Sequence, residues 1–110
     1  MKVRDILERL KLAVLSEGDL DAEVKNGYTC DLLSEVMGKA QADTVWITVQ
    51  THVNIIAVAT VVGIRMIILC NGHEVPEDML NKAKKEQITV ARTGKNPFEI
   101  SCEICKIGIR

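Results

Sequence analysis

The chain has 110 residues, 47% hydrophobic and 26% charged, so it can form one globular domain with a core and has neither a disordered nor a fibrous composition. Its net charge is -1, and it has no basic stripe interleaved with aromatic residues, which excludes a nucleic-acid-binding surface. Only 3% of the residues are aromatic, so Ile, Val, Leu and Met must fill the core, as is typical of parallel strands buried between helices.

Neither the N-terminal segment nor the most apolar run of the chain predicts a membrane protein. The N-terminal segment lacks the apolar stretch and small-residue cleavage site of a signal peptide, so we expect a cytoplasmic protein. The most apolar run, Val53 to Leu69, is interrupted and falls short of the roughly 18 clean residues of a membrane span. The interruptions are Asn54, Thr60, Gly63 and Arg65.

The first elements alternate between helix and strand. Apolar residues in Val3–Leu10 follow the i, i+3, i+4, i+7 spacing of a helix with one buried stripe. Residues 12–15 form a short extended piece, and a turn at 16–19 follows. Residues 24–30 are a possible strand that Asn26 and Gly27 interrupt.

A second helix and a third strand come next. Residues 32–40 have one apolar face, and we expect Asp31 to cap this helix and Gly38 to end it. The β-branched residues in 44–50 predict a strand.

The segment from Thr51 to Gly63 predicts a helix, with Thr51 as its cap and Gly63 as its stop. This helix is apolar nearly all round, so it is either sandwiched inside the domain or buried against a second copy of the chain. Because a domain this small cannot easily enclose a helix, we favour a homodimer contact.

The remaining elements complete an alternating pattern. Residues 65–70 are the clearest strand, with the continuous apolar run of a central parallel strand. A helix from 77 to 86 opens at Pro76, a strand covers 88–91, and a last helix opens at Pro97. The pattern predicts a single α/β domain over residues 1–110, with a mainly parallel sheet flanked by helices.

Ligands of open parallel sheets lie beyond the carboxyl ends of the strands, so the residues that follow each strand are the candidate binding site. Free N–H groups at the start of the Thr51 helix, its dipole and Arg92 would favour an anion there. No phosphate-loop or dinucleotide fingerprint is present, and the same residues also fit plain cap and turn positions. The candidate ligand-binding residues are Thr29, Asp31, Gln50, Thr51, His52, Asn54, Asn71, Gly72, His73, Arg92 and Thr93.

The two histidines and the paired cysteines each have a functional and an ordinary interpretation. His52 and His73 could form an acid–base pair or ligate a metal, or they are exposed loop residues, which we favour. Cys102 and Cys105 have the spacing of half a zinc or redox motif, but the other half is missing, so we expect ordinary thiols. We expect no metal site, no cofactor and no catalytic residues.

The chain resembles the DRTGG domain family over nearly all of its length, and four segments carry the resemblance: YTCDLLSEVMGKA (28–40), DTVWITVQTHVNIIAVA (43–59), MIILCNG (66–72) and ITVARTGKNPFE (88–99). At the family's Asp-Arg and Thr-Gly-Gly positions the chain has Thr51-His52 and Cys70-Asn71-Gly72. The resemblance is to stand-alone members, and it implies a fold similar to the N-terminal domain of HPr kinase, often paired as a dimer. It also implies a regulatory role without catalytic activity.

We therefore expect a non-catalytic regulatory or sensor domain. It would be a homodimer that holds a small anionic ligand, either a nucleotide or a phosphorylated metabolite, at the strand ends. Two alternatives remain open: a small phosphotransfer enzyme or partner that uses His52 or His73, and a scaffold or interaction protein of a redox or signalling complex.

Overall fold

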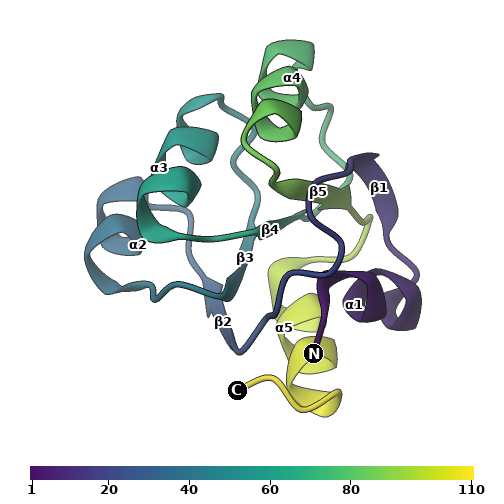
Figure 1. Ribbon diagram of the computed structural model, residues 1–110. Coiled ribbons are helices and arrows are strands. Elements are labelled where there is room, and N and C mark those ends of the chain that lie inside the picture. Colours follow the sequence, from purple (N-terminus) through teal and green to yellow (C-terminus); the bar gives the residue numbers. More distant parts are fainter.

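The computed structural model describes residues 1–110 and contains five strands and five helices (Figure 1). The helices are α1 (Val3–Leu10), α2 (Leu33–Lys39), α3 (Asn54–Val62), α4 (Glu77–Lys85) and α5 (Pro97–Lys106). The strands are β1 (Ala13–Ser16), β2 (Asn26–Thr29), β3 (Thr44–Thr48), β4 (Met66–Leu69) and β5 (Thr89–Arg92).

All five strands join one sheet in the order β1-β5-β4-β3-β2. Strands β2, β3, β4 and β5 run parallel, and β1 pairs antiparallel with β5 at one edge. The predicted α/β class with a mainly parallel sheet is therefore confirmed. Strand β4 lies at the centre, as its continuous apolar run indicated, because a central parallel strand is covered on both faces.

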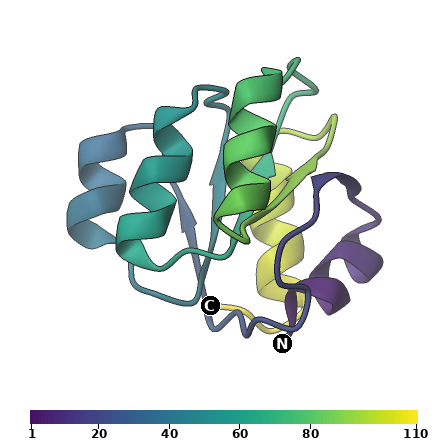
Figure 2. The same cartoon turned by 45° about the horizontal axis from the view of Figure 1, so that its top comes forward.

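Helices cover both faces of the sheet. Helices α2, α3 and α4 lie side by side on one face, and α1 and α5 lie on the other (Figure 2). Strand side chains alternate between the two layers, so Trp46 packs under α2 and α3, whereas Val45 and Ile47 pack against α5. The two termini lie close together at one end of the molecule (Figure 2).

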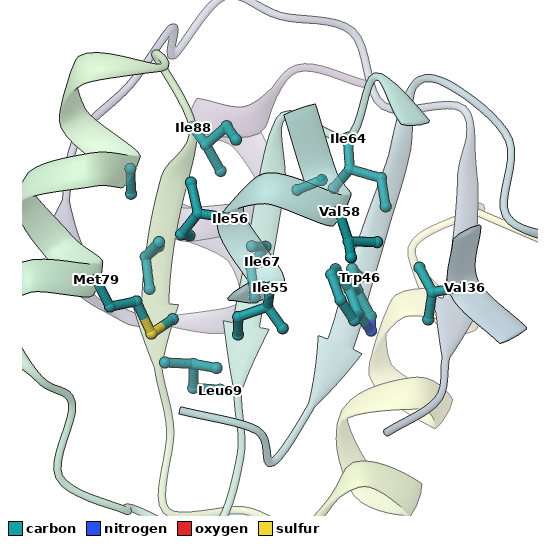
Figure 3. Close-up of a cluster of buried hydrophobic side chains, with 13 residues drawn as sticks. Val36, Trp46, Ile55, Ile56, Val58, Ile64, Ile67, Leu69, Met79 and Ile88 are labelled. Carbon is teal, nitrogen blue, oxygen red and sulfur yellow. The ribbon is translucent and has the colours of Figure 1, made fainter. Parts of the chain in front are cut away.

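Helix α3 is buried on its inner face and along both flanks within the domain. Ile55 and Ile56 are fully buried and Val58 is 6% exposed, in a cluster that also includes Trp46 and Met79 (Figure 3). The helix packs between α2 and α4 and lies on the sheet (Figure 2). Packing within one chain therefore accounts for most of its apolar side chains, although Ala57, Thr60 and Val61 on the outer face stay exposed. The apolar character of the helix as a whole no longer argues for a dimer contact.

The helix ends depart from three predictions. Helix α3 begins at Asn54 after a turn, with Val53 and not Thr51 in the cap position. Helix α2 is capped by Leu32 and not by Asp31, and it continues through Gly38 to Lys39. These predictions were wrong. The Asp31 carboxylate accepts hydrogen bonds from Thr48 and Val49 instead, and a turn at residues 52–53 separates Thr51 from the helix. The helix passes Gly38 by one residue, because a glycine inside a helix is tolerated at a small cost in free energy.

Other boundaries agree with the sequence more closely. Gly63 ends α3 in the left-handed conformation with φ 93°, as a C-terminal glycine should. Asn96 caps α5, with Pro97 as its first residue. The expected interruption of the strand at Asn26 and Gly27 was wrong, because these two residues begin β2. None of the helices combines the length and the apolar character that a membrane crossing requires.

Candidate functional site

The carboxyl ends of the four parallel strands meet at one end of the sheet, and the predicted site residues lie at this end. They follow β2 (Thr29, Asp31), β3 (Gln50, Thr51, His52, Asn54), β4 (Asn71, Gly72, His73) and β5 (Arg92, Thr93). We refer to these eleven residues as the rim. Most of the rim falls into three groups according to its hydrogen bonds, and Thr29 and Thr51 lie outside them.

The first group joins the ends of β2 and β3 through Asp31. Its Oδ1 accepts hydrogen bonds from Thr48 Oγ1 at 2.8 Å and from the backbone N–H of Val49 at 3.0 Å. Gln50 Nε2 donates to the Asp31 carbonyl at 3.1 Å. Asp31 thus fixes the turn after β3 and not the start of α2, which explains why it is no helix cap. Thr29 lies apart from this group and shares a hydrogen bond of 2.7 Å with Ser101 of α5.

The second group is the turn that leads into α3. His52 Nδ1 accepts the backbone N–H of Asn54 at 3.1 Å. The N–H groups of Ile55 and Ile56 donate to the carbonyls of His52 and Val53. The expected free N–H groups at this helix start are therefore already paired, and the turn leaves less backbone for an anion than a plain helix N-terminus would.

The third group joins β4 to β5. Asn71 and Gly72 both have left-handed backbones, with φ 66° and 64°, and their N–H groups donate to the carbonyls of Lys95 and Thr93 at 2.9 Å. Arg92 Nη1 donates to the His73 carbonyl at 3.4 Å. The loops after β4 and β5 are thus tied together, with a guanidinium group between them.

The rim holds no assembled catalytic or metal constellation. No hydrogen bond joins His52 to His73, and both side chains are exposed. No group of three or more His, Cys, Asp or Glu residues lies close enough to hold a metal ion. Cys102 and Cys105 are free, exposed thiols on α5. The buried thiol of Cys70 has its pKa raised to about 11, mainly by burial and secondly by the charge of Asp31, which leaves it a poor nucleophile.

The rim is an open shelf and not a cavity. Five hollows lie on the surface, and Thr29 is the one rim residue that lines any of them. A ligand at the rim would therefore be in contact with the protein on one side only. Such a surface binds ligands weakly unless another chain or domain closes over it.

None of these hollows is predicted by the sequence, and one of them is a polar hollow that borders β2. It has a volume of about 280 Å³ and lies beside β2 near the amino-terminal end of β3. Thr44 is 1% exposed there, and its Oγ1 is a buried side-chain atom without a hydrogen-bond partner. No sequence signal could have found it, because the hollow combines the end of α2 with the chain terminus. Its lining residues are Asn26, Gly27, Tyr28, Lys39, Ala40, Gln41, Thr44 and Arg110.

Comparisons with known proteins support the fold. No protein-family model and no curated protein sequence matches the chain. Its structure is similar to a crystal structure of the CBS and DRTGG domains of the regulatory region of Clostridium perfringens pyrophosphatase, complexed with the activator diadenosine tetraphosphate. The TM-score is 0.76 at 17% sequence identity, over 92% of this chain and 44% of that one. The chain thus spans less than half of that regulatory region and has a DRTGG-like fold.

Proposed function

We propose that this protein is a regulatory module without catalytic activity, that it acts as a homodimer, and that its rim binds a small anionic ligand such as a nucleotide or a phosphorylated metabolite. The observation that carries the proposal is the similarity of fold to a regulatory region that was crystallised with a dinucleotide activator. Membership of the stand-alone DRTGG family is part of the same proposal.

The unpaired polar groups of the rim support a ligand there. His52 uses Nδ1 within its own turn and keeps Nε2 free, and no hydrogen bond within the chain engages the side-chain amides of Asn54 and Asn71. Arg92 donates one hydrogen bond to the His73 carbonyl, and its guanidinium group has further donors in a planar arrangement that matches phosphate oxygens. One guanidinium with several neutral donors suits a phosphate or carboxylate group.

The absence of assembled nucleophile, base and oxyanion donors favours binding over catalysis. The dimer has no support from α3, because among the large apolar side chains of this helix only Val61 is strongly exposed, at 73%. The dimer therefore needs another surface.

A thermal-shift experiment tests the ligand. Wild-type protein is screened with diadenosine tetraphosphate, ATP and glucose 6-phosphate, because a ligand present at 100 times its Kd stabilises the native state by about 2.7 kcal/mol. For a domain of this size we expect a rise in Tm of roughly 10 °C. In Arg92→Gln the shift should shrink or vanish, whereas the matched variant Arg9→Gln on the exposed face of α1 should keep it.

A shift that persists unchanged in Arg92→Gln would place the ligand away from the rim. If none of the three probes shifts Tm at millimolar concentration, the proposed anionic ligand class is refuted for this chain on its own. Neither outcome bears on the oligomeric state, which sedimentation measures separately.

A further inference from the structure

Strand β2 leaves one side of its backbone without partners. Along its inner side, Asn26 N–H donates to the Asp43 carbonyl and Cys30 N–H to the Ile47 carbonyl, each at 3.2 Å. Because backbone groups of successive residues in a strand alternate in direction, the N–H and C=O groups of Gly27 and Thr29 point outward. No strand or helix pairs with that side, and both residues are exposed.

The opposite edge of the sheet is protected, and β2 is not. The register of β1 on β5 shifts between Val14 and Ser16, and such a bulge twists an edge away from further pairing. By contrast, β2 keeps a regular register with β3 over four residue pairs and contains neither a proline nor a bulge. An edge of this kind is a template for another strand.

Space lies on both faces of this edge. The polar hollow with the unpartnered Thr44 hydroxyl lies on the α2 face, where Tyr28 points. A smaller hollow of about 90 Å³ lies on the α5 face, lined by Gly27, Thr29 and apolar side chains that include Ile104. The alternating side chains of an added strand would therefore have room above and below the sheet.

We propose that the added strand is β2 of a second copy of this chain, antiparallel to the first, with a twofold axis at Tyr28. In this register Gly27 of each copy pairs with Thr29 of the other, which gives four backbone hydrogen bonds from the four unpaired groups of each strand. The two Tyr28 side chains become a close cross-strand pair. Two five-stranded sheets would join into one continuous sheet.

Charge complementarity selects a second copy over an unrelated peptide. The segment Lys25 to Asp31 carries a cation three residues before Tyr28 and an anion three residues after it. In the symmetric register Lys25 of one copy therefore faces Asp31 of the other, twice. Asp31 uses Oδ1 for Thr48 and Val49 and has Oδ2 free. Lys25 is 66% exposed, and its ammonium lies 3.9 Å from Asp43 Oδ2 of its own chain, a long surface contact that leaves it able to pair with a second carboxylate.

This interface rests on the homodimer of the proposed function and gives it a surface. Sedimentation velocity over the micromolar range should show a concentration-dependent dimer for the wild type. Thr29→Pro removes one outward N–H per copy and no bond to β3, so we expect dimerisation to weaken by about 10- to 100-fold. Lys25→Glu places like charges opposite each other and should weaken it several-fold, more strongly at low salt. Lys84→Glu on α4 makes the same charge change far from this edge and should have no effect.

A direct test uses Tyr28→Cys in a background with Ser at the other four cysteine positions. The central pair of this register is not hydrogen-bonded, and its Cα separation of about 4.5 Å lies within the range of disulfides. We expect an interchain disulfide under mild oxidation, and none in the matched Val14→Cys variant on the other edge.

Each outcome decides between distinct ideas. A wild type that stays monomeric at all concentrations refutes both the interface and the homodimer. A dimer that resists Thr29→Pro and Lys25→Glu and does not crosslink at position 28 refutes only the interface and keeps the dimer. Far-UV circular dichroism confirms that each variant is folded; if Thr29→Pro is not, Lys25→Glu and the crosslink decide.

Discussion

Truncation of Ile56 to alanine tests whether α3 belongs to the core or to an interface. The side chain is fully buried between the sheet and α4, in a cluster that includes Met79 and Ile88. Ile→Ala removes three carbon groups at about 0.8 kcal/mol each, and the cavity adds to this loss, so we expect the free energy of unfolding to fall by about 3 kcal/mol or more. Urea denaturation followed by circular dichroism measures the change.

The matched control is Val61→Ala on the same helix. Val61 is 73% exposed, so its truncation should change the free energy of unfolding by less than about 0.5 kcal/mol. The loss in Ile56→Ala should be independent of protein concentration, because the contacts lie within one chain. A loss below about 1 kcal/mol, or one that appears only at concentrations where the protein dimerises, would refute the placement of α3 in the core.

Three further predictions concern the backbone, a thiol and an ion pair. Gly63→Ala should destabilise the protein by about 1–2 kcal/mol, because φ is 93° and the new Cβ would lie 3.1 Å from a neighbouring side chain. Gly38 lies within α2 and has open space where a Cβ would be, so Gly38→Ala should stabilise the protein by about 0.5–1 kcal/mol. Chemical denaturation measures both changes. Cys70, with its pKa at about 11, has only about a thousandth of its thiol ionised at pH 8, so a thiol reagent followed by mass spectrometry should label it only after unfolding. Arg4 donates a hydrogen bond to Asp21 that lowers the pKa of the Asp21 carboxyl group. At a pH above the ordinary pKa range of Asp, the wild type should therefore have a larger free energy of unfolding than Asp21→Asn. This difference should vanish as the pH falls through the lowered pKa.

Each of these predictions has an outcome that contradicts it. Equal stability changes at the two glycines would show that the left-handed backbone of residue 63 is unimportant. Native labelling of Cys70 as fast as that of the exposed Cys102 would show that the thiol is accessible. A difference between wild type and Asp21→Asn that grows toward acid would reverse the sign of the linkage.

The elements of the fold could be predicted because each carries a local signal. The spacing of apolar residues gave α1 its bounds, Val3–Leu10, and the run before Cys70 identified β4 as a central strand. Caps were less predictable. Thr51 and Asp31 have good capping side chains, but Asp31 bonds across to Thr48 and Val49, a long-range contact that local sequence does not encode.

The candidate site shows the same division. The sequence placed polar residues after successive strands, and parallel pairing brings them to one end of the sheet. It could not show that the N–H groups before α3 are paired within their own turn, or that the rim has no cavity, because both depend on how separate loops settle against each other.

By itself, the sequence determined the α/β class, the order of the elements and the strand-end location of the rim, since hydrophobic periodicity and turn residues act over short distances. Tertiary structure alone decided how the apolar helix α3 is covered and which strand keeps a backbone edge without hydrogen-bond partners. Helix α3 is covered because α2 and α4 pack on either side of it. Strand β2 is exposed because the strand order ends there, and strand order depends on contacts between residues far apart in the chain.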